Sequence, residues 1–199
     1  RYADGQNWDT SLFDLPGTYS LRPTTLDEAI TRDVLLGRLS GEPQPQLIVL
    51  VADATHLPLS LRLVLDIKRL GLPMVVALNM SDLALRRGYA LDRERLAQEL
   101  GVPVVETVAV VRHGADALLA QLERSGAGAA EREALSWADP GTAEVEAAHA
   151  QVRAILQAIN YRVPVRSRIA SRADAILMHP VGGMLALAVL LFFVFQAVF

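Results

Sequence analysis

The sequence predicts an α/β domain built on a parallel sheet, followed by a helical segment and one membrane-spanning helix. Short apolar runs alternate with helical patterns over the first 125 residues. A Gly/Ala-rich stretch then begins after Ser125, and the final 19 residues carry no charge. We therefore expect an α/β domain at 1–125, a helical linker domain at 126–173 and a transmembrane helix at 174–199.

Four apolar runs predict the strands. Each is short and ends at or near a polar or turn residue, as in a parallel sheet whose strands are buried on both faces. The run nearest the N-terminus is the weakest of the four. The predicted strands are Trp8–Phe13, Leu47–Val51, Met74–Leu78 and Val102–Val111.

Helical patterns separate these runs. Thr25 and Glu28 have the spacing of a capping box, which predicts a helix that begins at Leu26. Glycine and proline after Leu70 and Leu100 predict where two further helices end. The predicted helices are 26–38, 59–70, 92–100, 115–124 and 142–159, the last with one apolar stripe.

Composition excludes several functional classes. The 199 residues contain no cysteine, which excludes disulfide frameworks and cysteine-ligated metal sites. The net charge of −3 gives no basic footprint for a nucleic-acid partner. Of 19 basic residues 18 are arginine, so chemistry that needs a lysine must use Lys68.

The segment Val181–Phe199 predicts a membrane span. Nineteen residues of helix extend about 28 Å, close to the thickness of the hydrocarbon core of a lipid bilayer. Five arginines and no acid lie between Glu146 and Asp174, which favours the cytoplasmic side for residues 1–173. The alternatives are a buried core helix for the apolar segment and a solvated helix face for the arginines.

Two of the strand ends carry polar side chains that could bind a nucleotide. Asp14-Leu15-Pro16-Gly17 offers a carboxylate that could hold Mg²⁺ through water, and a glycine N–H that could approach a phosphate. Taken alone, this tetrapeptide is better explained by a turn that ends a strand, since many turns contain an aspartate and a glycine at this spacing.

Asn79-Met80-Ser81-Asp82 follows the strand predicted at 74–78. The Asp82 carboxylate could accept hydrogen bonds from the ring N–H and the exocyclic NH₂ of guanine, a donor pair that adenine lacks on that edge. The Asn79 amide has both a donor and an acceptor, so it could bond the base and brace the loop. In Val108-Ala109-Val110, a small residue could present a backbone N–H to a purine oxygen.

The order and spacing of these three segments match those of a small GTP-binding domain. The segments DLPGTYSL at 14–21, ALNMSD at 77–82, DAILMHPVGG at 174–183 and FQAVF at 195–199 resemble the bacterial ferrous iron transport protein B family. Met80 is typical of that family, whereas most small G proteins have lysine there. The resemblance implies a partial P-loop-type G domain, a helical domain and the first helix of a polytopic membrane domain.

The resemblance also implies ligands and roles. Asp14 would serve Mg²⁺ through water, Gly17 the γ-phosphate, Asn79 and Asp82 the guanine of GTP or GDP, and Ala109 the guanine carbonyl. The intact protein would hydrolyse GTP to regulate or drive Fe²⁺ uptake across the bacterial inner membrane. Its Fe²⁺ site would lie outside these residues, and it could form a homo-oligomer through the membrane domain.

The phosphate-cradling motif G-x-x-x-x-G-K-[ST] is absent from the 199 residues, because Lys68 follows no glycine-rich loop. We expect that motif upstream of Arg1, which makes this chain an N-terminally truncated piece that is inactive alone. Two alternatives stay open: a single-span, membrane-anchored regulatory GTPase, and a non-catalytic G-like interaction module.

We predict that the 199-residue chain alone binds GTP weakly and hydrolyses none. Most of the affinity for a triphosphate comes from the backbone N–H groups and the lysine around its phosphates. Equilibrium binding of a fluorescent GTP analogue tests this prediction, and a micromolar dissociation constant would contradict it.

Overall fold

The computed structural model describes residues 12–22, 25–39, 41, 44–125, 137–164, 175 and 177–198. The chain forms two compact units, Arg1–Arg162 and Val163–Phe199. The predicted strand Trp8–Phe13 lies outside the described residues except for Leu12 and Phe13, which belong to no strand.

The first unit is built on a three-stranded parallel sheet among the described residues. Its strands β1 (Ile48–Asp53), β2 (Met74–Asn79) and β3 (Val104–Thr107) lie in the order β1-β2-β3. The prediction of a parallel sheet with flanking helices is confirmed. The strand expected at Val102–Val111 is shorter than predicted, because the chain turns after Thr107.

The helices of the first unit follow the predicted patterns within a few residues, with one addition. The short helix after β2 was not expected, because its six residues follow the strand directly. The helices are α1 (Leu26–Leu35), α2 (Leu57–Arg69), α3 (Ser81–Arg86), α4 (Arg93–Leu100), α5 (Asp116–Ser125) and α6 (Thr142–Ala158).

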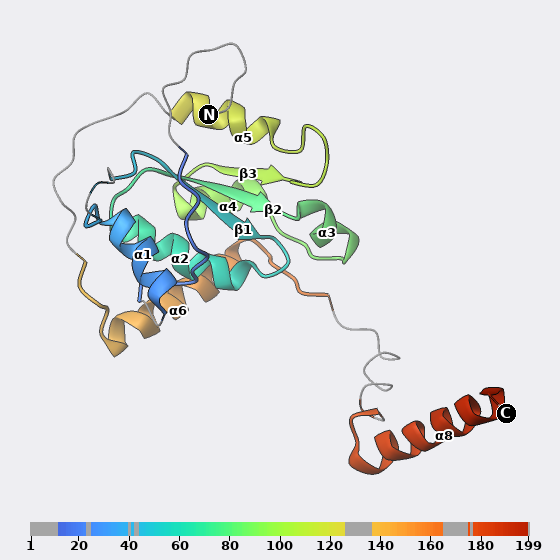
Figure 1. Ribbon diagram of the computed structural model, residues 1–199. Helices are drawn as coiled ribbons and strands as arrows, with labels where there is room; N and C mark the ends of the chain where they lie inside the picture. Colours follow the sequence, from blue (N-terminus) through green and yellow to red (C-terminus); the bar gives the residue numbers. More distant parts are fainter. Residues whose placement is uncertain are drawn as a thin grey trace. The chain divides into compact units, whose positions relative to one another are not determined.

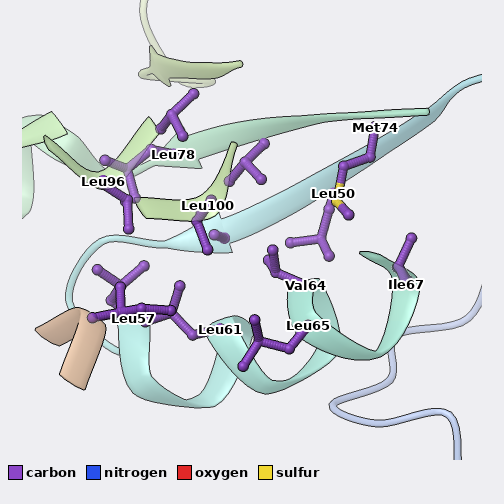
Figure 2. Close-up of a cluster of buried hydrophobic side chains, with 14 of the residues drawn as sticks. Leu50, Leu57, Leu61, Val64, Leu65, Ile67, Met74, Leu78, Leu96 and Leu100 are labelled. Carbon is purple, nitrogen blue, oxygen red and sulfur yellow. The ribbon is translucent and has the colours of Figure 1, made fainter. Parts of the chain in front are cut away.

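The core lies between one face of the sheet and helices α2 and α4 (Figures 1 and 2). Leu50 and Leu78 from the strands meet Leu61 of α2 and Leu96 of α4 in this layer. Helix α6 packs outside α2 and α4 and adds its buried apolar side chains to the same cluster. The predicted amphipathic helix therefore belongs to the same compact unit as the sheet.

The opposite face of the sheet is covered unevenly. Val75 and Ala77 of β2 are buried, and α5 contacts β2 and β3. Val51 of β1 is 64% exposed. The expectation that every strand is buried on both faces is therefore wrong for β1.

Two predicted helix signals operate as expected. The Thr25 side chain accepts from the Glu28 N–H, and the Glu28 side chain accepts from the Thr25 N–H, which is the capping box that begins α1. Gly101 ends α4 with a left-handed φ of 65°. Lys68 Nζ donates to the Leu100 carbonyl at 2.5 Å, so the single lysine of the chain caps the C-terminus of α4.

The second unit contains α8 (Pro180–Val198), whose side chains are largely exposed. Among the described residues α8 alone is long and apolar enough to span a bilayer. His179 Nδ1 accepts from the N–H groups of Val181 and Gly182, so it satisfies two donors of the first turn.

We predict that Lys68→Met lowers the free energy of unfolding by about 0.5–1 kcal/mol, because the C-terminal carbonyls of α4 lose a cationic partner. Chemical denaturation of both proteins measures the difference. Arg87→Met is the matched control, since the Arg87 side chain is exposed and has no hydrogen bond or ion pair with a described residue. Equal loss in both variants would contradict the capping role.

Candidate functional site

The carboxyl ends of the three strands bring polar side chains to one edge of the sheet. In the strand register Asp53 pairs with Asn79, and Asn79 pairs with Thr107. Ligands of parallel α/β sheets bind at this edge. It is therefore the place in the first unit where chemistry is expected.

Asn79 connects two of the predicted segments. Its Oδ1 accepts from the Ala109 N–H at 3.3 Å and from Thr107 Oγ1 at 3.5 Å. The predicted bracing of the loop by this amide is therefore present. No described residue accepts a hydrogen bond from its amide nitrogen, which leaves the Asn79 NH₂ group available at the edge.

Met80 turns the chain from β2 into α3. It has a left-handed φ of 59°, and its side chain is 44% exposed. Ser81 Oγ lies 3.5 Å from the Thr107 carbonyl, which links the start of α3 to the end of β3. Asp82 forms an ion pair with Arg86 one turn later, so a ligand of the Asp82 carboxylate competes with this arginine.

A cavity of about 310 Å³ lies beside this loop. Asp82 and Glu106 line it together with apolar side chains that include Leu78 and Leu91. Neither Asn79 nor Ala109 lines the cavity, so of these three residues Asp82 alone faces it.

The loop after β3 is closed by its own backbone. The Val108 N–H donates to the Gly114 carbonyl at 3.0 Å, and a Cβ on Gly114 would lie 2.1 Å from the Val108 oxygen. This closure holds Ala109 beside Asn79 and leaves Val110 92% exposed. Because the Ala109 N–H already donates to Asn79, a purine carbonyl would have to share or replace that bond.

The segment Asp14-Leu15-Pro16-Gly17 has no regular secondary structure. Its Asp14 side chain is exposed, and nothing lies within 4 Å of the position that a Gly17 Cβ would occupy. Thr31 Oγ1 of α1 donates to the Pro16 carbonyl at 2.9 Å. Among the described residues no hydrogen bond or ion pair joins this segment to residues 79–82 or 108–110.

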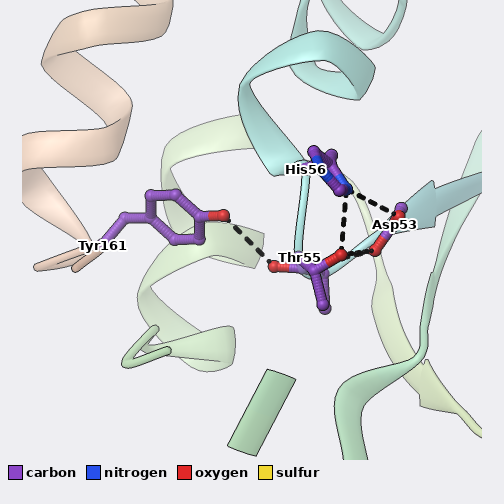
Figure 3. A network of polar contacts seen from close by, with 5 residues as sticks. Asp53, Thr55, His56 and Tyr161 are labelled. Atoms are coloured by element: carbon purple, nitrogen blue, oxygen red, sulfur yellow. Dashed lines mark hydrogen bonds and ion pairs between the residues drawn. The ribbon is translucent and has the colours of Figure 1, made fainter. Parts of the chain in front are cut away.

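Sequence reasoning missed a polar network at the end of β1 (Figure 3). Asp53 Oδ1 accepts from the N–H and the hydroxyl of Thr55, both at 2.7 Å, and Oδ2 lies 3.1 Å from His56 Nδ1. Partial burial acts to raise the pKa of Asp53, but the bonds from Thr55 and the contact with His56 hold it below its usual value. The one sequence signal was an aspartate directly after an apolar run.

Tyr161, which follows α6 in the chain, contacts the same loop (Figure 3). Its hydroxyl donates to the Ala54 carbonyl at 3.3 Å, while the Ala54 N–H donates to the Asn79 carbonyl at 3.0 Å. The ring lies 5.9 Å from that of Tyr89, between ring centroids. Burial raises the pKa of Tyr161 to about 12, so the hydroxyl stays protonated and able to donate.

Comparison with known proteins assigns the chain to a family. The model of the family described as ferrous iron transport protein B matches residues 2–122, more than half of the chain. The chain belongs to this family. The resemblance inferred from residues 14–21 and 77–82 is therefore confirmed.

Curated relatives support the same assignment. The chain is 40% identical over 121 residues to the Fe(2+) transporter FeoB of Salmonella typhimurium, covering 59% of this chain and 15% of the relative. It is 35% identical over 118 residues to the Fe(2+) transporter FeoB of Staphylococcus aureus, covering 59% and 17%. The chain thus spans less than a fifth of the length of these ferrous iron transport protein B relatives.

Solved structures share the fold. The cytosolic domain of the Thermotoga maritima FeoB iron transporter in its GMPPNP form has a TM-score of 0.62 at 22% identity, over 73% of this chain and 79% of that one. The FeoB G-domain from Methanococcus jannaschii has a TM-score of 0.52 at 36% identity, over 56% and 69%. The sheet and its flanking helices therefore have the G-domain fold.

We predict that Gly114→Ala destabilises the first unit by about 1–3 kcal/mol, because the new methyl group overlaps the Val108 carbonyl oxygen. Thermal unfolding followed by circular dichroism measures this effect. Gly141→Ala is the control, since open space surrounds Gly141 and its φ of −67° suits alanine. Equal melting temperatures for Gly114→Ala and the original chain would show that the closure of the loop is not tight.

Proposed function

We propose that the edge formed by Asn79, Asp82 and Ala109 recognises the guanine of GTP or GDP. The observation that carries this proposal is the geometry of Asn79: its oxygen holds the Ala109 loop while its NH₂ group faces no described acceptor. That NH₂ group can donate to a purine acceptor, and the partly exposed Asp82 carboxylate can accept from the guanine N–H and NH₂.

Met80 would supply an apolar surface for the base. Its exposed thioether side chain follows Asn79 directly and can pack on a planar ring. Ser81 supports the arrangement through its contact with the end of β3, and Val108 and Val110 flank the Ala109 N–H. These contacts address the base and the loop around it, not the phosphates.

We infer that Asp14 and Gly17 face the phosphate side. Asp14 is exposed and suits Mg²⁺ held through water, and the space around Gly17 lets its N–H approach a phosphate oxygen. Leu15 and Pro16 hold this segment in place, the latter through Thr31. Bound Mg²⁺ would neutralise charge on the phosphates.

For the protein that carries this chain, we propose GTP-regulated or GTP-driven uptake of Fe²⁺ across the bacterial inner membrane. The family membership and α8 support this proposal. Residues 1–173 would lie in the cytoplasm as a G domain (1–125) and a helical linker domain (126–173), with the span at 174–199. The Fe²⁺ site would lie outside these residues, and homo-oligomers would form through the membrane domain.

We predict that Asp82→Ala abolishes discrimination between guanine and adenine nucleotides in a polypeptide that includes the phosphate-binding loop. Asp82→Asn should shift the preference toward xanthine nucleotides, because an amide NH₂ can donate to the xanthine 2-carbonyl where a carboxylate cannot. Competition binding with the di- and triphosphates of the three bases measures both effects.

Glu94→Ala is the charge-matched control, since Glu94 is an exposed acid on α4 that does not line the cavity beside Asp82 and pairs with Arg93 instead. Unchanged base selectivity in Asp82→Ala would remove the guanine assignment. Selectivity altered equally in Glu94→Ala would mean that net charge, not recognition, produced the change.

A further inference from the structure

Asp66 is a buried carboxylate that takes no part in the proposed recognition of guanine. It lies on α2 and is 4% exposed, whereas acidic side chains are almost never buried without a partner. Its Oδ2 accepts from the N–H of Leu21 at 3.4 Å. Leu21 is itself 0% exposed, so both partners of this bond lie in the interior.

The bond anchors the segment that follows Gly17. Leu21 lies four residues after Gly17, and the Pro16 carbonyl just before Gly17 is held by Thr31. Two buried helical residues, Thr31 and Asp66, thus fix the chain on either side of Gly17–Ser20. Between these anchors Tyr19 is 65% exposed. Among the described residues the polar contacts of this stretch are local ones that join Thr18, Ser20 and Arg22.

Ionisation of Asp66 acts in opposite directions on its hydrogen bond to Leu21 and on the stability of the fold. Burial raises the pKa of Asp66 above 3.8, opposed by the Leu21 N–H and by Arg62 and Arg69 on the same helix. Among the described residues no charged group of β1, α6 or the 12–22 segment contributes to the shift. Because the Leu21 N–H lowers the pKa, ionisation of Asp66 must strengthen that bond and protonation must weaken it.

Ionisation of Asp66 has the opposite effect on the stability of the whole fold. A carboxyl group whose folded pKa is raised stabilises the fold below its unfolded pKa of about 3.8, and that contribution is lost as pH rises through the folded pKa. The ionised side chain therefore costs stability while it holds Leu21. A residue retained at such a cost is a candidate for a functional role.

We propose that Asp66 is a positioning residue that, together with Thr31, sets the resting position of Gly17–Ser20 opposite the nucleotide phosphates. The position of the phosphates in this proposal rests on the proposed function. The anchoring of Leu21 by Asp66 does not depend on it. Asp66 touches no ligand in this proposal; it acts through the Leu21 backbone.

The test is amide exchange measured by NMR on the 199-residue chain in detergent micelles, from about pH 7 to about pH 4, expressed as protection factors. We expect Leu21 protection to fall severalfold on acidification in the original chain, while that of Val76 in β2 does not fall. Asp66→Asn keeps an acceptor oxygen but cannot ionise, so its Leu21 protection should not change with pH. Asp33→Asn on α1 is the matched control and should behave like the original chain.

Thermal unfolding supplies the second readout. Asp66→Asn should be at least as stable as the original chain at neutral pH, so a change at Leu21 is not a sign of general unfolding. Leu21 protection that is independent of pH in the original chain, or that falls in parallel in Asp66→Asn, would overturn the proposal.

A nucleotide arm separates this proposal from the proposed function. In a polypeptide with the phosphate-binding loop, Asp66→Asn should change the ratio of GTP-analogue to GDP affinity and leave guanine-over-adenine selectivity unchanged. An unchanged ratio would overturn the link from Asp66 to the phosphates. If the original polypeptide binds no guanine nucleotide, the proposed function fails, and the exchange experiment still decides whether Asp66 anchors Leu21.

Discussion

The burial of β2 between two parallel neighbours is the constraint on which the rest of the first unit depends. The first five residues of β2 are buried, so its backbone must be paired on both sides, and it is, with β1 and β3. This pairing brings Asp53, Asn79 and Thr107 to one edge in register. The buried apolar residues fix the register of the strands, and this register brings the polar side chains at the strand ends together.

Much of this fold could be predicted because the signals were local. The apolar runs that became β1 and β2 and the capping box at Thr25 need no knowledge of distant residues. The third strand was overestimated because valine favours strands, whereas the chain turns at Val108 to meet Gly114. Helix α3 is six residues long and begins after the left-handed Met80, too short for a helical period to show.

The candidate site was only partly predictable, for a physical reason. Asn79 ends β2, and residues 80–82 and 109 follow closely after strands, so their sequence position implies a place at the edge. Asp66 and Tyr161 act through folding contacts with residues 45 and 107 positions away. Nothing in a helical pattern distinguishes a buried aspartate from a solvated one until the segment packed against it is known.

The two hydrogen bonds at Ala54 have a consequence for how the first unit comes apart. One ties the loop after β1 to Asn79, and the other ties it to Tyr161, which follows α6 in the chain. If α6 detaches and carries Tyr161 with it, the Ala54 carbonyl beside Asn79 loses this donor. We expect melting of α6 and loss of order at that edge to be one cooperative event with a single midpoint.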